Sequence, residues 1–293
     1  MEKYPRLRLH NGAEYRFSAC GDVPWTIVAR LADAMCLEFR EPSERQKQVS
    51  VVLRHPWVKH PQNGVGRIEA SVVDPGEDGT FLALQLMRIA SVVARDAEGR
   101  GGVLLHGALV EREGYGYLLA GPGGVGKTTA TRRLPRPWRP LCDDATLVVR
   151  GPGGNYQAHP WPTWSRFMFG GGGGCWDVEP AVPLQGIFFL AQDDEDRARP
   201  LGAGRSANLL VEAAEQISPS MFGVFDKEVI RAFRLRRFDN ICRLARAVPG
   251  FELRLSLKGA FWYEMERVAF SIQKPIRLGR WTRHPFEMAH ESA

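Results

Sequence analysis

The sequence predicts a mixed α/β protein, and three observations support this expectation. Apolar runs of strand length alternate with segments of helical spacing along most of the 293 residues. One run, Tyr115–Ala120, leads directly into the glycine-rich stretch GPGGVGKTT, and a helical segment follows. Composition is that of a folded globular protein, with 44% apolar and 25% charged residues. We therefore expect a mixed sheet with flanking helices and a small N-terminal α/β region.

Three parts are expected along the chain: a small α/β region at 1–80, a main domain at 81–270 and a C-terminal tail at 271–293. In the first part, Asn11-Gly12 favours a hairpin turn. Pro24 suits the first turn of a helix that runs to Leu37. The strands expected in this part are 49–53 and 67–73.

The main domain opens with the strongest helical pattern, Phe81–Arg95, in which apolar residues recur at three- and four-residue spacing. Arg197 and Arg199 belong to a charged stretch that we expect to be solvated. The other expected helices are 127–134, 207–217 and 227–248. The expected strands are 103–110, 115–120, 138–142, 145–150, 156–159, 187–191, 251–257 and 261–265.

Charge and hydropathy limit the partners. The net charge is +6, and the basic run Arg231–Arg237 is typical of a solvated helix face. We therefore expect no nucleic acid partner, and an acidic peptide remains an alternative partner. No stretch approaches the roughly 20 apolar residues of a membrane helix, and the N-terminus has no signal-peptide core. We expect a cytoplasmic protein without a membrane partner, and leave open a homo-oligomer.

The cysteines predict neither a disulfide framework nor a zinc site. Their number is odd and none has C-x-x-C spacing, which favours a reducing compartment. They are Cys20, Cys36, Cys142, Cys175 and Cys242.

The stretch GPGGVGKTT fits the pattern G-x-x-x-x-G-K-T and predicts a phosphate-binding loop. Glycines let backbone N–H groups face phosphate oxygens, while Lys127 can contact the β and γ phosphates and Thr128 can ligate Mg²⁺. The alternative is a glycine-rich turn that only caps a helix. The expected nucleotide-binding residues are Gly121, Pro122, Gly123, Gly124, Val125, Gly126, Lys127, Thr128 and Thr129.

Two adjacent carboxylates, Asp143 and Asp144, follow the short strand after this helix. A parallel β–α–β unit would return that strand's carboxyl end to the phosphate side of the sheet. One carboxylate could then hold Mg²⁺ and the other could accept a proton. We assign Asp143 as the proton acceptor, and Asp144 and Thr128 as ligands of the metal. The alternative is a simple turn.

The segment LLHGALVEREGYGYLLAGPGGVGKTTATRRLPRPWRPLCDDATLVV resembles the catalytic core of HPr serine kinase/phosphorylase. Length and layout resemble the HPr-kinase-like proteins encoded beside peptide-modification enzymes, in particular the ScmC group of the SynChlorMet cassette. The resemblance implies an HPr kinase-like fold, ATP and Mg²⁺ as cofactors, and catalytic roles for His106, Asp143 and Asp144. The chain departs from that family at Phe167–Trp176, where a Glu-Ile-Arg-Gly segment is missing.

These features predict an ATP- and Mg²⁺-dependent kinase that phosphorylates a Ser or Thr hydroxyl of a peptide or protein. A ribosomally made precursor peptide within a peptide-modification cassette is one candidate acceptor. The alternatives are a non-catalytic ATP-binding module of a peptide-maturation complex and a small-molecule kinase. The aromatic stretch Pro160–Phe167 predicts either a peptide-binding lip, with Arg166 near phosphate, or core packing by Trp161 and Trp164.

Overall fold

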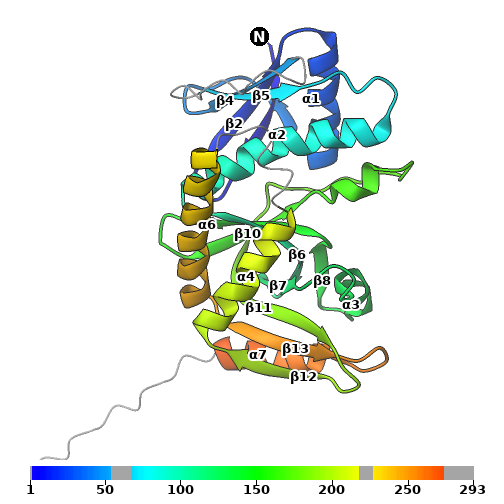
Figure 1. Cartoon of the computed structure of the whole chain (residues 1–293), viewed down its shortest axis with the longest axis vertical. Helices are drawn as coiled ribbons and strands as arrows, with labels where there is room; N and C mark the ends of the chain where they lie inside the picture. The colour runs from blue at the N-terminus through cyan, green and yellow to red at the C-terminus, as the bar shows by residue number, and fades with distance from the viewer. Residues whose placement is uncertain (1, 54–66, 218–226, 274–293) are drawn as a thin grey trace, which may run out of the picture.

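The computed structural model describes residues 2–53, 67–217 and 227–273, and it shows the expected mixed α/β fold (Figure 1). A five-stranded sheet is formed by the N-terminal residues and an eight-stranded sheet by the rest. Most of the expected tail lies outside the described residues. The proposed boundaries at 80 and 270 stay a prediction.

The N-terminal sheet has the strand order β3-β1-β2-β4-β5. The first two strands form the expected hairpin, and β2, β4 and β5 run parallel to one another. Tyr15 and Phe17 of this sheet and Leu31 and Met35 of its helix are fully buried. The elements are β1 (Tyr4–Arg8), β2 (Glu14–Ala19), α1 (Asp22–Met35), β3 (Glu38–Arg40), β4 (Lys47–Leu53) and β5 (Arg67–Val72).

Helix α2 (Gly79–Gly99) lies between the two sheets (Figure 1) and contacts both β5 and β6. It begins where the carboxylate of Asp78 accepts hydrogen bonds from the N–H groups of Thr80 and Phe81. Most of its buried apolar residues belong to a single cluster that also includes residues of both sheets. One continuous core therefore joins the N-terminal sheet to the main sheet.

The main sheet has the strand order β10-β9-β6-β7-β11-β13-β12, and β8 also pairs with β6. Its two faces are both covered, because neighbouring residues such as Leu118 and Leu119 belong to different apolar clusters. The strands are β6 (Val103–Arg112), β7 (Tyr115–Ala120), β8 (Arg139–Cys142), β9 (Ala145–Arg150), β10 (Tyr156–Trp161), β11 (Val182–Gln192), β12 (Arg197–Leu201) and β13 (Gly250–Leu255). The helices are α3 (Lys127–Arg133), α4 (Ala203–Ile217), α6 (Lys227–Ala247) and α7 (Trp262–Gln273), with a 3₁₀ turn at Trp164–Phe167.

One sequence prediction near the C-terminus is wrong. The segment 261–265, expected to be a strand, leads into α7, and the buried residues Phe261, Met265, Val268 and Ala269 recur at helical spacing. The expectation that Arg197 and Arg199 are solvated is confirmed, although they lie on an edge strand that was not expected, β12, paired antiparallel with β13. Its charged side chains face solvent while the small residue between them is buried, a pattern typical of an edge strand.

The expectation of no disulfide is also corrected. Cys36 and Cys175 form a disulfide across 139 residues, between the end of α1 and the glycine run. Next to it, the N–H of Trp176 donates to the carbonyl of Ala34. Residues so far apart leave no signature in local spacing, and for this reason the pairing was missed.

His159, on β10, joins the main sheet to the first hairpin. Its ring is fully buried; Nε2 accepts a hydrogen bond from the N–H of His10 at 3.2 Å, and Nδ1 lies 2.8 Å from the carbonyl oxygen of Val178. Only the neutral ring with its proton on Nδ1 satisfies both contacts, because a proton on Nε2 would face another N–H. Burial lowers the pKa of His159 to about 4.

We expect His159 to make folding sensitive to acid. Its folded pKa lies below the unfolded value, so the unfolded chain binds the proton first, and stability is lost as the pH falls from about 6.5 towards 4. The loss should be on the order of 3 kcal/mol, measured by urea unfolding at pH 7 and pH 4.5. His159→Gln should lose much of this dependence, whereas the control His10→Gln, which keeps its backbone N–H, should retain it. Equal pH dependence in wild type and His159→Gln would contradict this role.

Candidate functional site

The register of β6 determines which residues meet at the site. Gly107 pairs with Ala120, the last residue of β7, while His106 pairs with Ala145 at the start of β9. Strand β8 pairs with the other half of β6, so the chain between β8 and β9 passes beside Gly107. There the N–H of Gly107 donates to the carbonyl of Asp144 at 2.8 Å. The aspartate pair and the end of β7 thus lie on opposite sides of one strand.

The glycine loop, Gly121–Thr129, connects β7 to α3 in a conformation that depends on glycine. Gly124 and Gly126 have φ angles of 78° and 104°, a region that other residues rarely adopt. A Cβ at Gly123, Gly124 or Gly126 would meet no atom within 4 Å. Backbone conformation therefore requires glycine at 124 and 126, and the loop surface above all three glycines is open.

The side chain of Lys127 folds back against this loop. Its Nζ donates to the carbonyl oxygens of Gly121 at 2.9 Å and Pro122 at 3.1 Å, and the residue is only 7% exposed. Burial lowers the pKa of Lys127, an effect that the charge of Asp144 opposes. The loop thus holds an ammonium group directly beneath its open surface.

His106 lies beside Asp144 and close enough to this ammonium group to be affected by its charge. Its Nδ1 is 3.3 Å from Oδ1 of Asp144. Burial and, next, the charge of Lys127 lower the pKa of His106, against the opposing effect of Asp144. The imidazole is consequently neutral at pH 7, with a lone pair available on one ring nitrogen.

Asp143 is held differently from its neighbour. Its Oδ1 accepts a hydrogen bond from the hydroxyl of Thr163 at 2.8 Å, and its Oδ2 pairs with the guanidinium of Arg166 at 2.5 Å. Thr163 immediately precedes the 3₁₀ turn Trp164–Phe167, and Arg166 lies within it. Thr163 belongs to no recognisable motif, so its contact with Asp143 could not be predicted from the sequence. Arg166 was expected near phosphate, whereas it pairs with the carboxylate of Asp143.

The aromatic stretch itself packs inside the protein. Trp161 and Trp164 are 1% and 7% exposed, which favours core packing over a peptide-binding lip. Phe167 packs against Trp176 with ring centroids 6.1 Å apart, and the guanidinium of Arg166 lies over the same indole. These rings fix the side chain that reaches Asp143.

The predicted site residues meet in one surface hollow of about 380 Å³. Three residues of the loop, Gly121, Pro122 and Val125, do not line it. The carbonyl oxygens of the first two accept hydrogen bonds from Lys127, and Val125 is buried in the core. The lining residues are His106, Gly123, Gly124, Gly126, Lys127, Thr128, Thr129, Asp143 and Asp144.

The donor set in this hollow fits a nucleotide with Mg²⁺. The hydroxyl of Thr128 and the carboxylate of Asp144 are hard oxygen ligands, and Mg²⁺ commonly takes one or two such groups together with phosphate oxygens. Within residues 2–53, 67–217 and 227–273, no group of three or more His, Cys, Asp or Glu is placed to hold a metal by itself. A metal here would therefore depend on the phosphates for most of its ligands.

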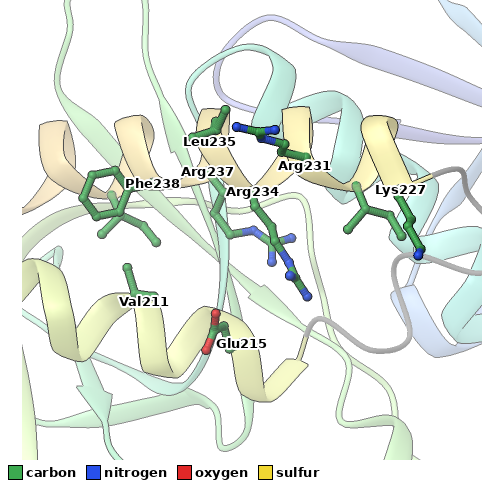
Figure 2. Close-up of a pocket in the computed structure, with 10 residues that line it drawn as sticks. Val211, Glu215, Lys227, Arg231, Arg234, Leu235, Arg237 and Phe238 are labelled. Atoms are coloured by element: carbon green, nitrogen blue, oxygen red, sulfur yellow. The ribbon is translucent and has the colours of Figure 1, made fainter.

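A separate hollow of about 900 Å³ lies between α4 and α6 (Figure 2) and includes no residue of the glycine loop. Phe238 and Val211 face each other across it, while Arg234 extends from α6 into the space between the two helices. Arg237 of the same helix is buried and paired with Glu98 of α2, so the expected solvated face holds for only part of the basic run.

The fold and the site define a mixed α/β protein with a G-x-x-x-x-G-K-T loop facing an acidic pair and a histidine. Residues 71–271, more than half of the chain, match the family model of the SynChlorMet cassette protein ScmC. The chain belongs to this family.

A solved structure, the HPr(Ser) kinase/phosphatase from Coxiella burnetii, is similar over 58% of this chain and 99% of that chain, with 9% sequence identity and a TM-score of 0.31. No curated protein matches. Among the helices that the structure describes, none combines the length and apolar character needed to cross a membrane.

The two aspartates should differ in their effect on stability. Asp143→Asn removes the charge that pairs with Arg166 and one acceptor site, so it should lower the free energy of unfolding by about 1–2 kcal/mol. Asp144→Asn is the matched control and should change it by less than about 0.5 kcal/mol. Urea unfolding at pH 7.5 measures both, and equal losses would show that Asp143 is not the structural member of the pair.

Proposed function

We propose that this protein is an ATP- and Mg²⁺-dependent kinase that transfers the γ-phosphate to a Ser or Thr hydroxyl of a peptide or protein. The observation that carries this proposal is the meeting of Lys127, Thr128, His106 and Asp144 in one hollow above the glycine loop. A buried cation, oxygen ligands for a metal and a neutral base are the groups that phosphoryl transfer needs.

Each group in the hollow has a proposed role. Lys127 and the N–H groups of the loop bind the phosphates, while Thr128 and Asp144 hold Mg²⁺. The metal, when bound, neutralises charge on the phosphates. Asp143 positions the loop that carries Thr163 and Arg166, because both of its carboxylate oxygens already have partners.

The contacts of Asp143 move the role of proton acceptor from that residue to His106. A proton on Nδ1 of His106 faces Asp144, so Nε2 carries the lone pair. As the acceptor oxygen forms its bond to the γ-phosphorus, its proton passes to Nε2, and the bond from that phosphorus to the bridging oxygen breaks to release ADP.

A peptide or protein acceptor is supported by the exposure of the site. The side chain of Asp144 is 35% exposed and the hollow opens at the surface, so a hydroxyl on a larger molecule can approach it. The resemblance to proteins encoded beside peptide-modification enzymes supports a peptide acceptor, and a ribosomally made precursor peptide is the acceptor we propose.

A second candidate is a non-catalytic ATP-binding module that helps assemble a peptide-maturation complex. Its support is the engaged Asp143 together with the stretch 167–176, where a disulfide-linked glycine run replaces the acidic segment of the resembled kinases. Incubation with γ-labelled ATP and peptides from the same cassette separates the candidates. ATP binding without transfer to any peptide, and without hydrolysis, would favour the module.

Lys127→Ala should weaken ATP binding at least tenfold, because a charge-assisted contact of this kind contributes about 1.5–3 kcal/mol. Calorimetry with Mg²⁺ and ATP measures the affinity. Arg132→Ala is the matched control, since it removes an exposed cation from the same helix and should leave binding within twofold. Unchanged affinity in folded Lys127→Ala would refute the phosphate-loop assignment.

Transfer should depend on the protonation of His106. Because its folded pKa lies below 6.5, the rate should be constant near neutral pH and fall at pH values below that pKa, where the ring takes up its proton. His106→Gln should cut transfer by about 10²–10⁴ and remove this acid limb, with ATP affinity within a few-fold. Rates between pH 5 and 8 on both proteins provide the check. An unaltered profile in the variant would assign the proton to another group.

A further inference from the structure

A second hollow continues from the glycine loop on the side away from the aspartate pair. It measures about 970 Å³, at the upper end of the roughly 300–1,000 Å³ of small-molecule and cofactor sites. Gly124, Gly126 and Thr129 line both hollows, so the two meet along the loop. The other walls come from the turn after β11 and the loop after β13.

The two hollows differ in chemistry along this shared edge. The first contains Asp143 and the three groups proposed to act on the phosphates and their metal, Lys127, His106 and Asp144. The second has none of these and instead includes Leu255 and Leu257. A molecule whose phosphates follow the loop towards His106 must place its other end in the second hollow.

The far wall of the second hollow is held firmly. Arg133 of α3 donates to the carbonyl oxygens of Ser256 and Gly259, and its guanidinium lies 5.2 Å from the ring centre of Phe261. The N–H of Ser256 donates to Asp196 at 2.6 Å. This loop is therefore preorganised beside the glycine loop.

On this ordered loop, Leu257 is 80% exposed at the edge of the hollow. An exposed leucine alone is unremarkable in a protein surface, but here it stands beside buried Leu255 and opposite a phosphate-binding loop. Together they offer an apolar surface against which a flat base can pack.

A polar group completes the wall. The turn after β11 presents Asp193 and Asp194, and Asp193 is paired with Arg254 at 2.8 Å. The carboxylate of Asp194 has no hydrogen bond or ion pair with any residue that the structure describes. Carboxylates commonly accept hydrogen bonds from the hydroxyls of ribose.

We infer that this second hollow binds the nucleoside half of the nucleotide, with the base against Leu255 and Leu257 and the ribose hydroxyls on Asp194. The inference rests on the proposed function, since it names where the rest of the ATP molecule lies. It goes further by assigning a site to residues outside the glycine-loop motif.

The first test compares ATP with inorganic tripolyphosphate, which has the phosphates but no nucleoside. ATP should bind wild type more tightly, and Leu257→Ala should weaken ATP about three- to tenfold while leaving tripolyphosphate within twofold. Leu235→Ala, on α6 and 60% exposed, is the matched control and should change neither. Both leucines are exposed, so the variants should remain folded.

The second test addresses the ribose. Wild type should bind ATP more tightly than 2′,3′-dideoxy-ATP, and Asp194→Ala should abolish that difference while leaving tripolyphosphate within twofold. Equal binding of ATP and tripolyphosphate by wild type, with both lost in Lys127→Ala, would overturn the nucleoside site and leave the phosphate loop standing. Equal losses of both ligands in Leu257→Ala would also overturn it. If neither ligand binds wild type, the proposed function falls, and the nucleoside site falls with it.

Discussion

The arrangement of the site depends on one strand, β6, which forms ladders with β7, β8 and β9 at once. A shift of one residue in its register would turn His106 to the other face of the sheet and carry the aspartate pair away from the glycine loop. Core packing on both faces opposes such a shift, because Leu109 and Val110 are fully buried on opposite sides. The chemistry of the hollow is thus fixed by the apolar pattern of a strand that contributes only one of its side chains.

The adjacent aspartates show how neighbouring residues acquire different roles. Asp143 turns towards Thr163 and Arg166, whereas Asp144 faces His106 and Lys127. Arg166 is in turn held over Trp176, next to the disulfide. The phosphate hollow is therefore connected through Asp143 to the disulfide between the end of α1 and the glycine run. Asp144 remains available to the metal and the histidine.

The parts of the site that local sequence encodes could be predicted. The glycine loop, Asp143-Asp144 and His106 belong to short motifs. The expected direction of the strands was enough to predict that the aspartate pair lies close to the glycine loop. The partners of Asp143, the helical state of α7 and the Cys36–Cys175 bond could not be predicted. Each depends on contacts between segments distant in sequence, which spacing does not report. The reducing, cytoplasmic setting stays a prediction, and a disulfide is more typical of oxidising compartments.

The disulfide also has a consequence for the order of events during synthesis. Cys36 leaves the ribosome 139 residues before Cys175. By the time the second thiol emerges, the glycine loop, the acidic pair and Arg166 have all been translated. The bond can close only after this whole stretch is available to fold, and it then encloses every residue assigned to phosphate chemistry. Oxidation of these two thiols would therefore mark chains in which the end of α1 and the glycine run have already come together.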